Sequence, residues 1–415
     1  MNPMTRSLVR PAILATIVSL VALVCGCGGS GVLDGARRKL GTGDPAGALA
    51  ILDQEARQNP RDGRTLRLLA EAAAAMGEDE RAADALVRAE SLGRRDSLET
   101  GQLRVRLWRV RFAPVRKALD ALDEATAEEL TAARGALDGA ELLAPHRAEN
   151  PAARARLLLL DGPSDEVETL LATAADQVHG DPEAARAVVS SLLRVASSYA
   201  ALGRPATAVE MGRRAAELAP SDVRVEYDLG VHLHELGEAT SDTAAFGEAA
   251  RRFGRVLELL PGDVDARYNL GLSLYRLGRV REAEAEVRAL LARAPLESRG
   301  HLLGARLALA AGDSLRARAH AVASRAVRGE TSAVPASALS VSADAGHAGR
   351  KVFVLTGPPD RIFRYRERSG DVVEVWFRLD PPGFTAFSAG RVIAELELSE
   401  GKGDRGSIGL AGTDP

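Results

Sequence analysis

Side chains that could perform chemistry are few and scattered along the chain of 415 residues, which has seven histidines and two cysteines. His232 and His234 lie two residues apart on a predicted helix, about 200° apart around its axis, so they cannot both ligate one metal ion from one face. No second histidine follows His234 at the spacing of a zinc protease, and Lys402 lacks the preceding strand and helix of a phosphate-binding loop. The sequence therefore predicts no cofactor, no metal site and no catalytic residue. An enzyme with a site assembled from distant positions stays open as the alternative.

The two cysteines, Cys25 and Cys27, follow an apolar run of 14 residues from Pro11 to Val24. A membrane-spanning helix needs about 20 apolar residues, so this run is typical of the hydrophobic core of an export signal. The residues Val24-Cys25-Gly26-Cys27 resemble a bacterial lipobox, with Cys25 in a place where Ala, Ser or Thr is more common. The resemblance implies cleavage after Gly26 and lipidation of Cys27.

Gly28 follows the modified cysteine, where an aspartate would indicate retention in the inner membrane. The resemblance therefore implies an acylated lipoprotein of the outer membrane that faces the periplasm. More than one acyl chain on Cys27 would make the anchoring stable. The alternatives are an uncleaved N-terminal anchor and plain secretion.

Composition excludes several classes of protein. The 54 basic and 57 acidic residues give a net charge of −3 and are mixed throughout, unlike the basic domain of a nucleic-acid-binding protein. The hydrophobic content of 46% is too high for a disordered chain. One basic and aromatic run, residues 103–112, suits either a nucleic-acid or anionic-lipid surface or, as we prefer, a helix with solvated arginines over Leu107, Trp108 and Phe112.

A repeat of 34 residues runs through most of the chain. It is marked by glycines that form three pairs, by a small residue seven positions before each glycine, and in several units by a proline 17 positions after it. The glycine pairs are Gly43 and Gly77, Gly203 and Gly237, and Gly278 and Gly312. Glycine ends a first helix in a left-handed turn, small residues let two helices approach, and proline ends the second helix.

This pattern resembles the tetratricopeptide repeat (TPR), whose period is also 34 residues. The best unit runs from Arg267 to Pro295, and the Gly237 unit fits only with a seven-residue insertion in a loose region, residues 238–246. The resemblance implies a mostly α fold, in which stacked helix pairs form an α-α solenoid with a right-handed superhelix and a concave face.

The repeat divides the chain into segments. After the signal peptide (residues 1–26), we expect TPR units over 27–96, about three degenerate helical hairpins over 97–188 and TPR units over 189–330. Pro145, Pro151, Pro163 and Pro182 should break the middle segment into short helices. A linker over 331–349, a β module over 350–400 and a disordered tail over 401–415 complete the division.

The β module is predicted because the hydrophobic period changes to two. We expect antiparallel strands over 351–356, 362–366, 372–379, 384–387 and 391–398, with Val373, Val375, Phe377 and Leu379 on one face. A module of about 50 residues has little core of its own, so it should pack on the last helices. Its Gly357-Pro358-Pro359-Asp360 and residues 374–377 weakly resemble GWxTD-type domains or the small lipoprotein of the outer-membrane assembly machine.

Binding is the function that these features leave. The first helix of each unit should face the groove, and equal register aligns its residues between units. The aligned residues are Tyr227, Val231 and His234; Tyr268, Leu272 and Tyr275; and Leu302, Arg306 and Leu309. Asn269 lies where peptide-clamping members of the family have an asparagine, although the basic residues of a carboxylate clamp are missing from the neighbouring units.

The sequence thus predicts a lipid-anchored, non-catalytic scaffold or adaptor that holds a protein or peptide ligand in the TPR groove. Two or three tyrosines on a groove wall suit such a ligand because they offer contact area at a low cost in entropy. The alternatives are packing of these side chains against the next unit, an enzyme with its site in the β module, and a structural component that self-assembles.

Overall fold

The structure is a computed structural model that describes residues 28–328, 334–335, 352, 359–367 and 369–398. The described residues fall into two compact units that divide between Ser191 and Leu192. Cys25, Cys27 and the expected signal peptide, most of the linker and the tail lie outside the described residues.

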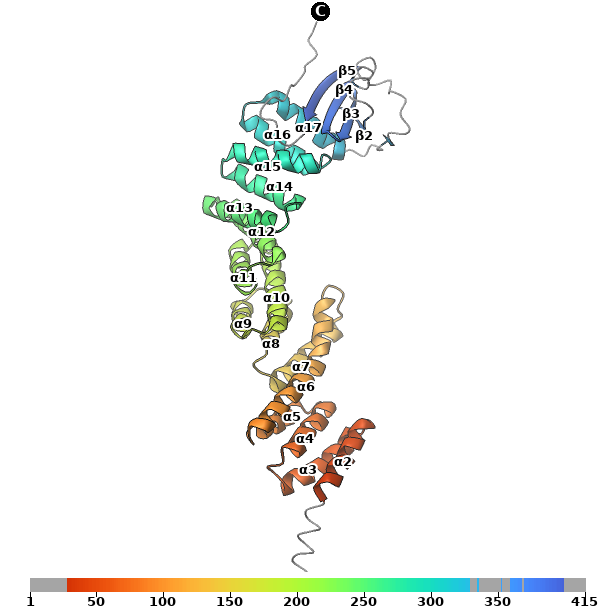
Figure 1. Cartoon of the computed structure of the whole chain (residues 1–415), viewed down its shortest axis with the longest axis vertical. Helices are drawn as coiled ribbons and strands as arrows, with labels where there is room; N and C mark the ends of the chain where they lie inside the picture. The colour runs from red at the N-terminus through yellow and green to blue at the C-terminus, as the bar shows by residue number, and fades with distance from the viewer. Residues whose placement is uncertain (1–27, 329–333, 336–351, 353–358, 368, 399–415) are drawn as a thin grey trace, which may run out of the picture. The chain divides into compact units, whose positions relative to one another are not determined.

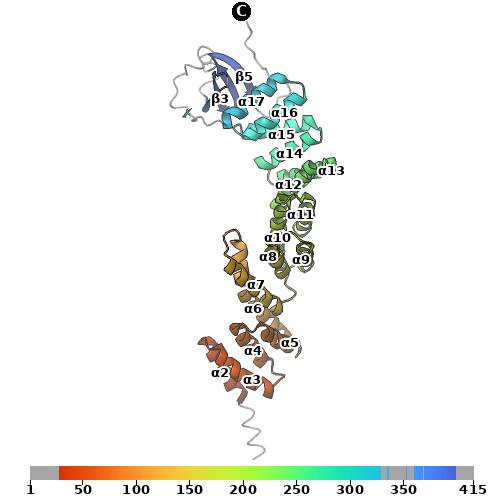
Figure 2. The same cartoon turned by 180° about the vertical axis from the view of Figure 1, so that it is seen from behind.

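The first unit is built from helices that pack on their neighbours in the chain, as Figures 1 and 2 show. Its buried side chains are mainly leucine and alanine, in one cluster around α2 to α5 and a smaller one around α6 to α8. The helices are α2 (Gly28–Gly41), α3 (Pro45–Gln58), α4 (Gly63–Met76), α5 (Asp79–Glu90), α6 (Arg94–Asp120), α7 (Ala127–Leu143), α8 (Glu149–Leu159) and α9 (Asp165–Asp176).

The second unit, taken by itself, is also built from helices and ends in a sheet (Figure 1). Each helix from α11 to α17 packs on the next one along the chain. These helices are α11 (Pro205–Leu218), α12 (Val223–Thr240), α13 (Thr243–Leu259), α14 (Val264–Arg276), α15 (Val280–Arg293), α16 (Ser298–Ala310) and α17 (Ser314–Arg328), while α10 (Pro182–Ala201) contains the division between the units.

Five of the six repeat glycines end a first helix as the sequence predicts. They adopt φ values between 72° and 78°, the left-handed conformation that glycine reaches without the steric cost of a Cβ atom. These glycines are Gly43, Gly77, Gly203, Gly278 and Gly312. The pattern of helix pairs in the two repeat regions is therefore confirmed.

Gly237 is the exception, and the expected loose region at residues 238–246 is wrong. Helix α12 continues to Thr240, Ser241 takes the left-handed conformation with φ of 58°, and α13 begins at Thr243. A Cβ atom on Gly237 would stand 2.8 Å from the Phe246 ring. Gly237 is therefore needed for the close packing of α12 on α13, and the inserted residues lengthen the helix pair.

The middle segment differs from the expected three hairpins. It contains two helix pairs, α6 with α7 and α8 with α9, followed by the start of α10. Pro145 and Pro163 lie between helices, and Pro182 begins α10. Pro151 does not break a helix, since it lies in the first turn of α8, where the missing backbone N–H has no helical partner to lose.

A small antiparallel sheet follows α17, with strands β2 (Arg361–Arg366), β3 (Val372–Leu379), β4 (Pro382–Ser388) and β5 (Arg391–Glu397). Their order in the sheet is their order in the sequence, so the strands form a meander (Figure 1). The short strand β1 (Val334–Pro335) pairs with β2 and lies within the expected linker, which is therefore not entirely a connection.

One face of the sheet packs on the last helices, as predicted. Val373, Val375 and Phe377 are buried in one hydrophobic cluster with side chains of α14 to α17, and the sheet contacts α17. Leu379 was expected on this face, but it is 43% exposed at the end of β3. The opposite face also buries Trp376, so both faces of β3 are covered.

Candidate functional site

The candidate site in the second unit lies on α12, α14 and α16, the first helices of consecutive pairs. Each begins at an acidic residue, Asp222, Asp263 or Glu297, whose carboxylate accepts a hydrogen bond from a backbone N–H of the first turn. Helix α14 contacts both α12 and α16. Because the three helices begin at equivalent acidic residues and neighbouring helices are in contact, equivalent residues of the three helices lie side by side.

Tyr227 and Asn269 join α12 to α14. The Asn269 Nδ2 atom donates a hydrogen bond of 3.0 Å to the Tyr227 hydroxyl. The Tyr227 ring meets Phe253 edge-on at 5.7 Å between centroids, and burial together with the nearby Asp265 raises the pKa of its hydroxyl. Asn269 is therefore engaged with a neighbouring repeat, and its amide nitrogen holds a groove tyrosine in place.

His234 makes a second link between these helices. Its Nδ1 atom lies 3.0 Å from the Ser273 hydroxyl, and its ring meets Phe246 at 5.1 Å. Burial lowers the pKa of the ring, although the Glu238 carboxylate is 3.4 Å from Nε2. His234 therefore contributes mainly to packing between repeats.

Tyr268 is held from the other side by α16. The Arg299 guanidinium lies over its ring at 5.1 Å from the centroid, and Arg299 is itself fixed by Asp265 at 2.6 Å and Glu297 at 2.9 Å. Such cation–π contacts orient an aromatic ring as well as stabilise it.

The other predicted groove residues divide by exposure. Val231, Leu272 and Tyr275 are half-buried and pack against the hydrophobic clusters of the repeats, whereas Arg306 is exposed. The structure therefore brings the predicted residues together on adjacent helices and also uses much of their surface for packing.

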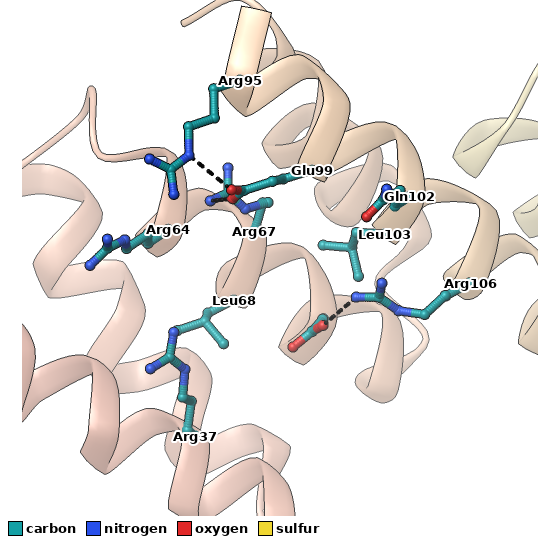
Figure 3. Close-up of a pocket in the computed structure, with 10 residues that line it drawn as sticks. Arg37, Arg64, Arg67, Leu68, Arg95, Glu99, Gln102, Leu103 and Arg106 are labelled. Atoms are coloured by element: carbon teal, nitrogen blue, oxygen red, sulfur yellow. Dashed lines mark hydrogen bonds and ion pairs between the residues drawn. The ribbon is translucent and has the colours of Figure 1, made fainter. Parts of the chain in front are cut away.

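The first unit has a pocket that the sequence analysis missed. It has a volume of 390 Å³ and lies among α2, α4 and α6. Figure 3 shows arginine side chains around it, with Leu68 and Leu103 between them. Its five arginines are Arg37, Arg64, Arg67, Arg95 and Arg106.

A signal for this pocket was present in the repeat register. The predicted groove residues Leu272 and Tyr268 lie six and ten residues before Gly278. In the first unit, Arg37 and Glu71 lie six residues before their turn glycines, and Arg67 lies ten residues before Gly77. The register could therefore have predicted these three residues. Residues of α6 could not be found in this way because its pair has no repeat glycine.

The basic and aromatic run forms part of α6, as the helix interpretation requires. Trp108 is buried, stacks on Phe112 at 4.8 Å and donates a hydrogen bond of 2.9 Å from Nε1 to Asn150. Not every arginine of the run is solvated, because Arg104 is only 17% exposed and pairs with Glu90 at 2.9 Å.

Near the β module, two buried histidines face each other. The Nδ1 atoms of His301 and His320 are 3.2 Å apart, and His301 Nε2 lies 2.8 Å from the Pro295 carbonyl oxygen. The His301 ring meets Phe377 and Phe384 of the sheet. Burial lowers the pKa of His301 to about 4 and that of His320 to about 3, so both rings are neutral parts of the core at pH 7.

Within residues 28–398, apart from the gaps given above, no group of three His, Cys, Asp or Glu side chains is arranged to hold a metal ion. None of the helices in this part of the chain is both long and apolar enough to cross a membrane.

Comparison with known families bears out the repeat interpretation. Models of the tetratricopeptide repeat family match residues 33–96 and 244–307. The chain contains tetratricopeptide repeats. The first match covers the helix pairs α2 with α3 and α4 with α5, and the second covers α13 to α16, which is the pair α14 with α15 and one helix on each side. No curated protein matches the chain.

Among solved structures, the TPR chain is similar to YrrB, described as a TPR protein with an unusual peptide-binding site, at 16% identity over 47% of this chain and 93% of that one, with a TM-score of 0.37. It is also similar to PilW, described as a type IV pilus biogenesis factor, at 18% identity over 54% and 96%, with a TM-score of 0.36. PilF of Pseudomonas aeruginosa is similar at 19% identity over 52% and 91%, with a TM-score of 0.35.

Proposed function

We propose that this TPR protein is a lipid-anchored scaffold of the bacterial envelope that binds a segment of a partner protein and performs no catalysis. The observation that carries this proposal is the row of tyrosines on α12 and α14, which contacts between repeats hold in fixed positions. Tyr227 is fixed by Asn269 and Phe253, and Tyr268 by Arg299.

Fixed aromatic side chains are suited to binding because little conformational entropy remains to be lost when a ligand arrives. Tyr227, Tyr268 and Tyr275 are half-buried, so each keeps part of its surface for a ligand. An extended or helical peptide would lie across α12 and α14 and contact the rings in turn.

The anchor rests on the resemblance of residues 24–27 to a lipobox. Helix α2 begins at Gly28, immediately after Cys27 in the sequence. A lipid on Cys27 would therefore hold the first helix pair next to the membrane surface and raise the local concentration of the repeats for a partner in the same compartment. We place this surface on the periplasmic side of the outer membrane.

The β module serves in this proposal as a cap on the last helix pair. Its inner face shares one hydrophobic cluster with α16 and α17, which would otherwise expose apolar side chains such as Leu307 and Val322. The paired histidines lie inside this covered region, where His301 has no exposed surface for a substrate.

Site-specific photocrosslinking tests the groove. A photoreactive residue at Tyr268 should capture one partner in cells that make the chain, whereas the same residue at the exposed Arg251 on α13 should not. Tyr227→Ala should reduce the capture. Equal capture from both positions, or none from Tyr268, would contradict the proposal.

A separate experiment tests the anchor. Cells fed with labelled palmitate should incorporate the label into the natural chain, and Cys27→Ser should abolish the labelling while Cys25→Ser retains it. Labelling that persists in Cys27→Ser would refute lipidation at Cys27 without affecting the proposal for the groove.

A further inference from the structure

The pocket of the first unit is lined by more guanidinium groups than carboxylates. Five guanidinium groups line it, with two carboxylates, Glu71 and Glu99. Asp34 and Asp96 lie beside it and pair with arginines of the lining. How these charges are paired decides what the pocket can bind.

Arg67 is the structural member of the group. Its side chain is only 13% exposed and donates to Asp96 at 2.8 Å and to Glu99 at 2.5 Å. These bonds connect α4 to α6 and pair one guanidinium group with both carboxylates. Arg95 lies 3.1 Å from the same Glu99 but remains 85% exposed.

Three other arginines of the lining form only exposed ion pairs or none. Arg106 is 3.5 Å from Glu71 and 62% exposed, and Arg37 makes only an exposed contact of 3.3 Å with Asp34 on its own helix. Arg64 is exposed and forms no ion pair with any described residue. Figure 3 shows the guanidinium groups of Arg37, Arg64 and Arg106 on three sides of Leu68. Exposed pairs of this kind contribute little to stability, so these cations are available to a ligand.

The size and shape of the lining favour a chain over a small ion. The arginines come from three first helices, α2, α4 and α6, and α4 contacts both of its neighbours. Neighbouring helix axes lie about 8–10 Å apart, so a ligand that reaches from Arg37 to Arg95 or Arg106 must span roughly 16–20 Å. An extended peptide covers that distance with about six residues at about 3.3 Å each.

We propose that this pocket binds an extended acidic segment of a partner protein, whose Asp or Glu side chains pair with Arg37, Arg64 and Arg106. Guanidinium groups bind carboxylates through two parallel hydrogen bonds, which gives direction as well as charge. Leu68 and Leu103 form an apolar floor on which an aliphatic side chain between two acidic residues would rest. The site is separate from the tyrosine row of α12 and α14 and does not depend on it.

Fluorescence anisotropy with a defined probe tests the proposal. The probe is a labelled ten-residue peptide of alternating Glu and Leu, and its control has Gln in place of every Glu. The full chain, in a non-ionic detergent, should bind the Glu peptide at least about tenfold more tightly than the Gln peptide, and raised salt should remove most of the difference.

A pair of matched variants separates the pocket from general electrostatics. The double substitution Arg37→Gln with Arg64→Gln should weaken binding of the Glu peptide by about tenfold. Arg38→Gln with Arg61→Gln removes the same charge from exposed positions outside the lining and should change binding less than twofold. Equal losses in both double variants, or equal binding of the two peptides, would overturn the proposal.

Anionic lipid is the competing ligand, because the proposed anchor would bring α2 to a membrane. Sedimentation with phosphatidylglycerol vesicles should show no dependence on Arg37 and Arg64. Vesicle binding that requires both arginines, without binding of the Glu peptide, would assign the pocket to a membrane and refute the proposal. Crosslinking from Tyr268 should be unchanged in the Arg37 and Arg64 variant, so failure at one site is distinguishable from failure at the other.

Discussion

Acid should destabilise the second unit through its two buried histidines. The pKa of His301 is about 4 and that of His320 about 3, because burial penalises the charged ring of each. The pKa of histidine in an unfolded chain is about 6.5. Below that pH the unfolded chain binds protons that the folded chain does not, so the free energy of unfolding falls as pH decreases from about 6.5 towards 4 and 3. Above pH 6.5 the unfolded chain no longer binds these two protons, so the histidines cause no loss in the free energy of unfolding.

The magnitude follows from the same pKa values. At pH 5 each ring is neutral in the folded chain and protonated in the unfolded chain, which removes about 2 kcal/mol per ring relative to pH 7.5. The two rings together therefore account for a loss of about 4 kcal/mol, a large fraction of the stability of an ordinary domain. Glu297 opposes and Arg316 reinforces the depression of the pKa values, both less strongly than burial.

Pulsed hydrogen exchange across a urea series measures this loss locally. Peptides from β3 and β4 report the second unit, and peptides from α4 and α5 report the first unit in the same sample. The control is His301→Gln with His320→Asn, which places amide groups near the positions of the ring nitrogens and removes both titrations. The pH-dependent loss in β3 and β4 between pH 7.5 and 5.0 should be about 4 kcal/mol smaller in this variant than in the natural chain.

An equal pH dependence in the natural chain and the variant would refute the reasoning, since other groups would then cause the whole effect. Should the double variant not fold, the natural chain still decides the matter. A loss of stability at pH 5.0 no greater in β3 and β4 than in α4 and α5 would contradict the assignment to the paired histidines.

Two further predictions concern packing. Gly254→Ala in α13, where no atom lies within 4 Å of the new Cβ, should raise the free energy of unfolding by about 0.5–1 kcal/mol, whereas Gly230→Ala should lower it by about 1 kcal/mol because the Cβ would stand 2.9 Å from the buried Phe253 ring. Urea unfolding measures both, and equal effects would contradict this account. Trp108→Phe should lower the free energy of unfolding of the first unit by about 1–3 kcal/mol, because the buried Asn150 Oδ1 loses its donor. Asn150→Ala in the Trp108→Phe background should then cost less than it does alone.

The sequence predicted the features that local conformation determines. A left-handed turn selects glycine whatever lies around it, so Gly43 or Gly278 could be recognised from spacing alone. The alternation of residues 372–379 likewise predicted β3, since period two exposes alternate residues on opposite faces. Where an insertion moved the turn, from Gly237 to Ser241, the same rule gave the wrong end of the helix.

Features that depend on several elements at once could not be predicted in this way. His301 and His320 lie on different helices, and the His301 ring meets Phe377 and Phe384, which follow far along the chain. Pocket residues that lie outside the register of the predicted groove positions have no local signature either. Arg64 is one of many arginines in the sequence, and only the placement of α2, α4 and α6 shows that it faces a pocket.

Each first helix has buried positions where helices cross and neighbouring positions that face the groove. This division explains how the same repeat can form an arginine pocket in one unit and a tyrosine row in the other. Small residues such as Ala70 and Gly271, seven residues before the turn glycine, are buried where helices cross and leave little freedom for substitution. The position one residue later in the same helices faces the groove, and it is Glu71 in the first unit and Leu272 in the second. Changing such a residue alters what the face binds while the crossing of the helices stays the same. An arginine pocket and a tyrosine row are therefore compatible with one fold.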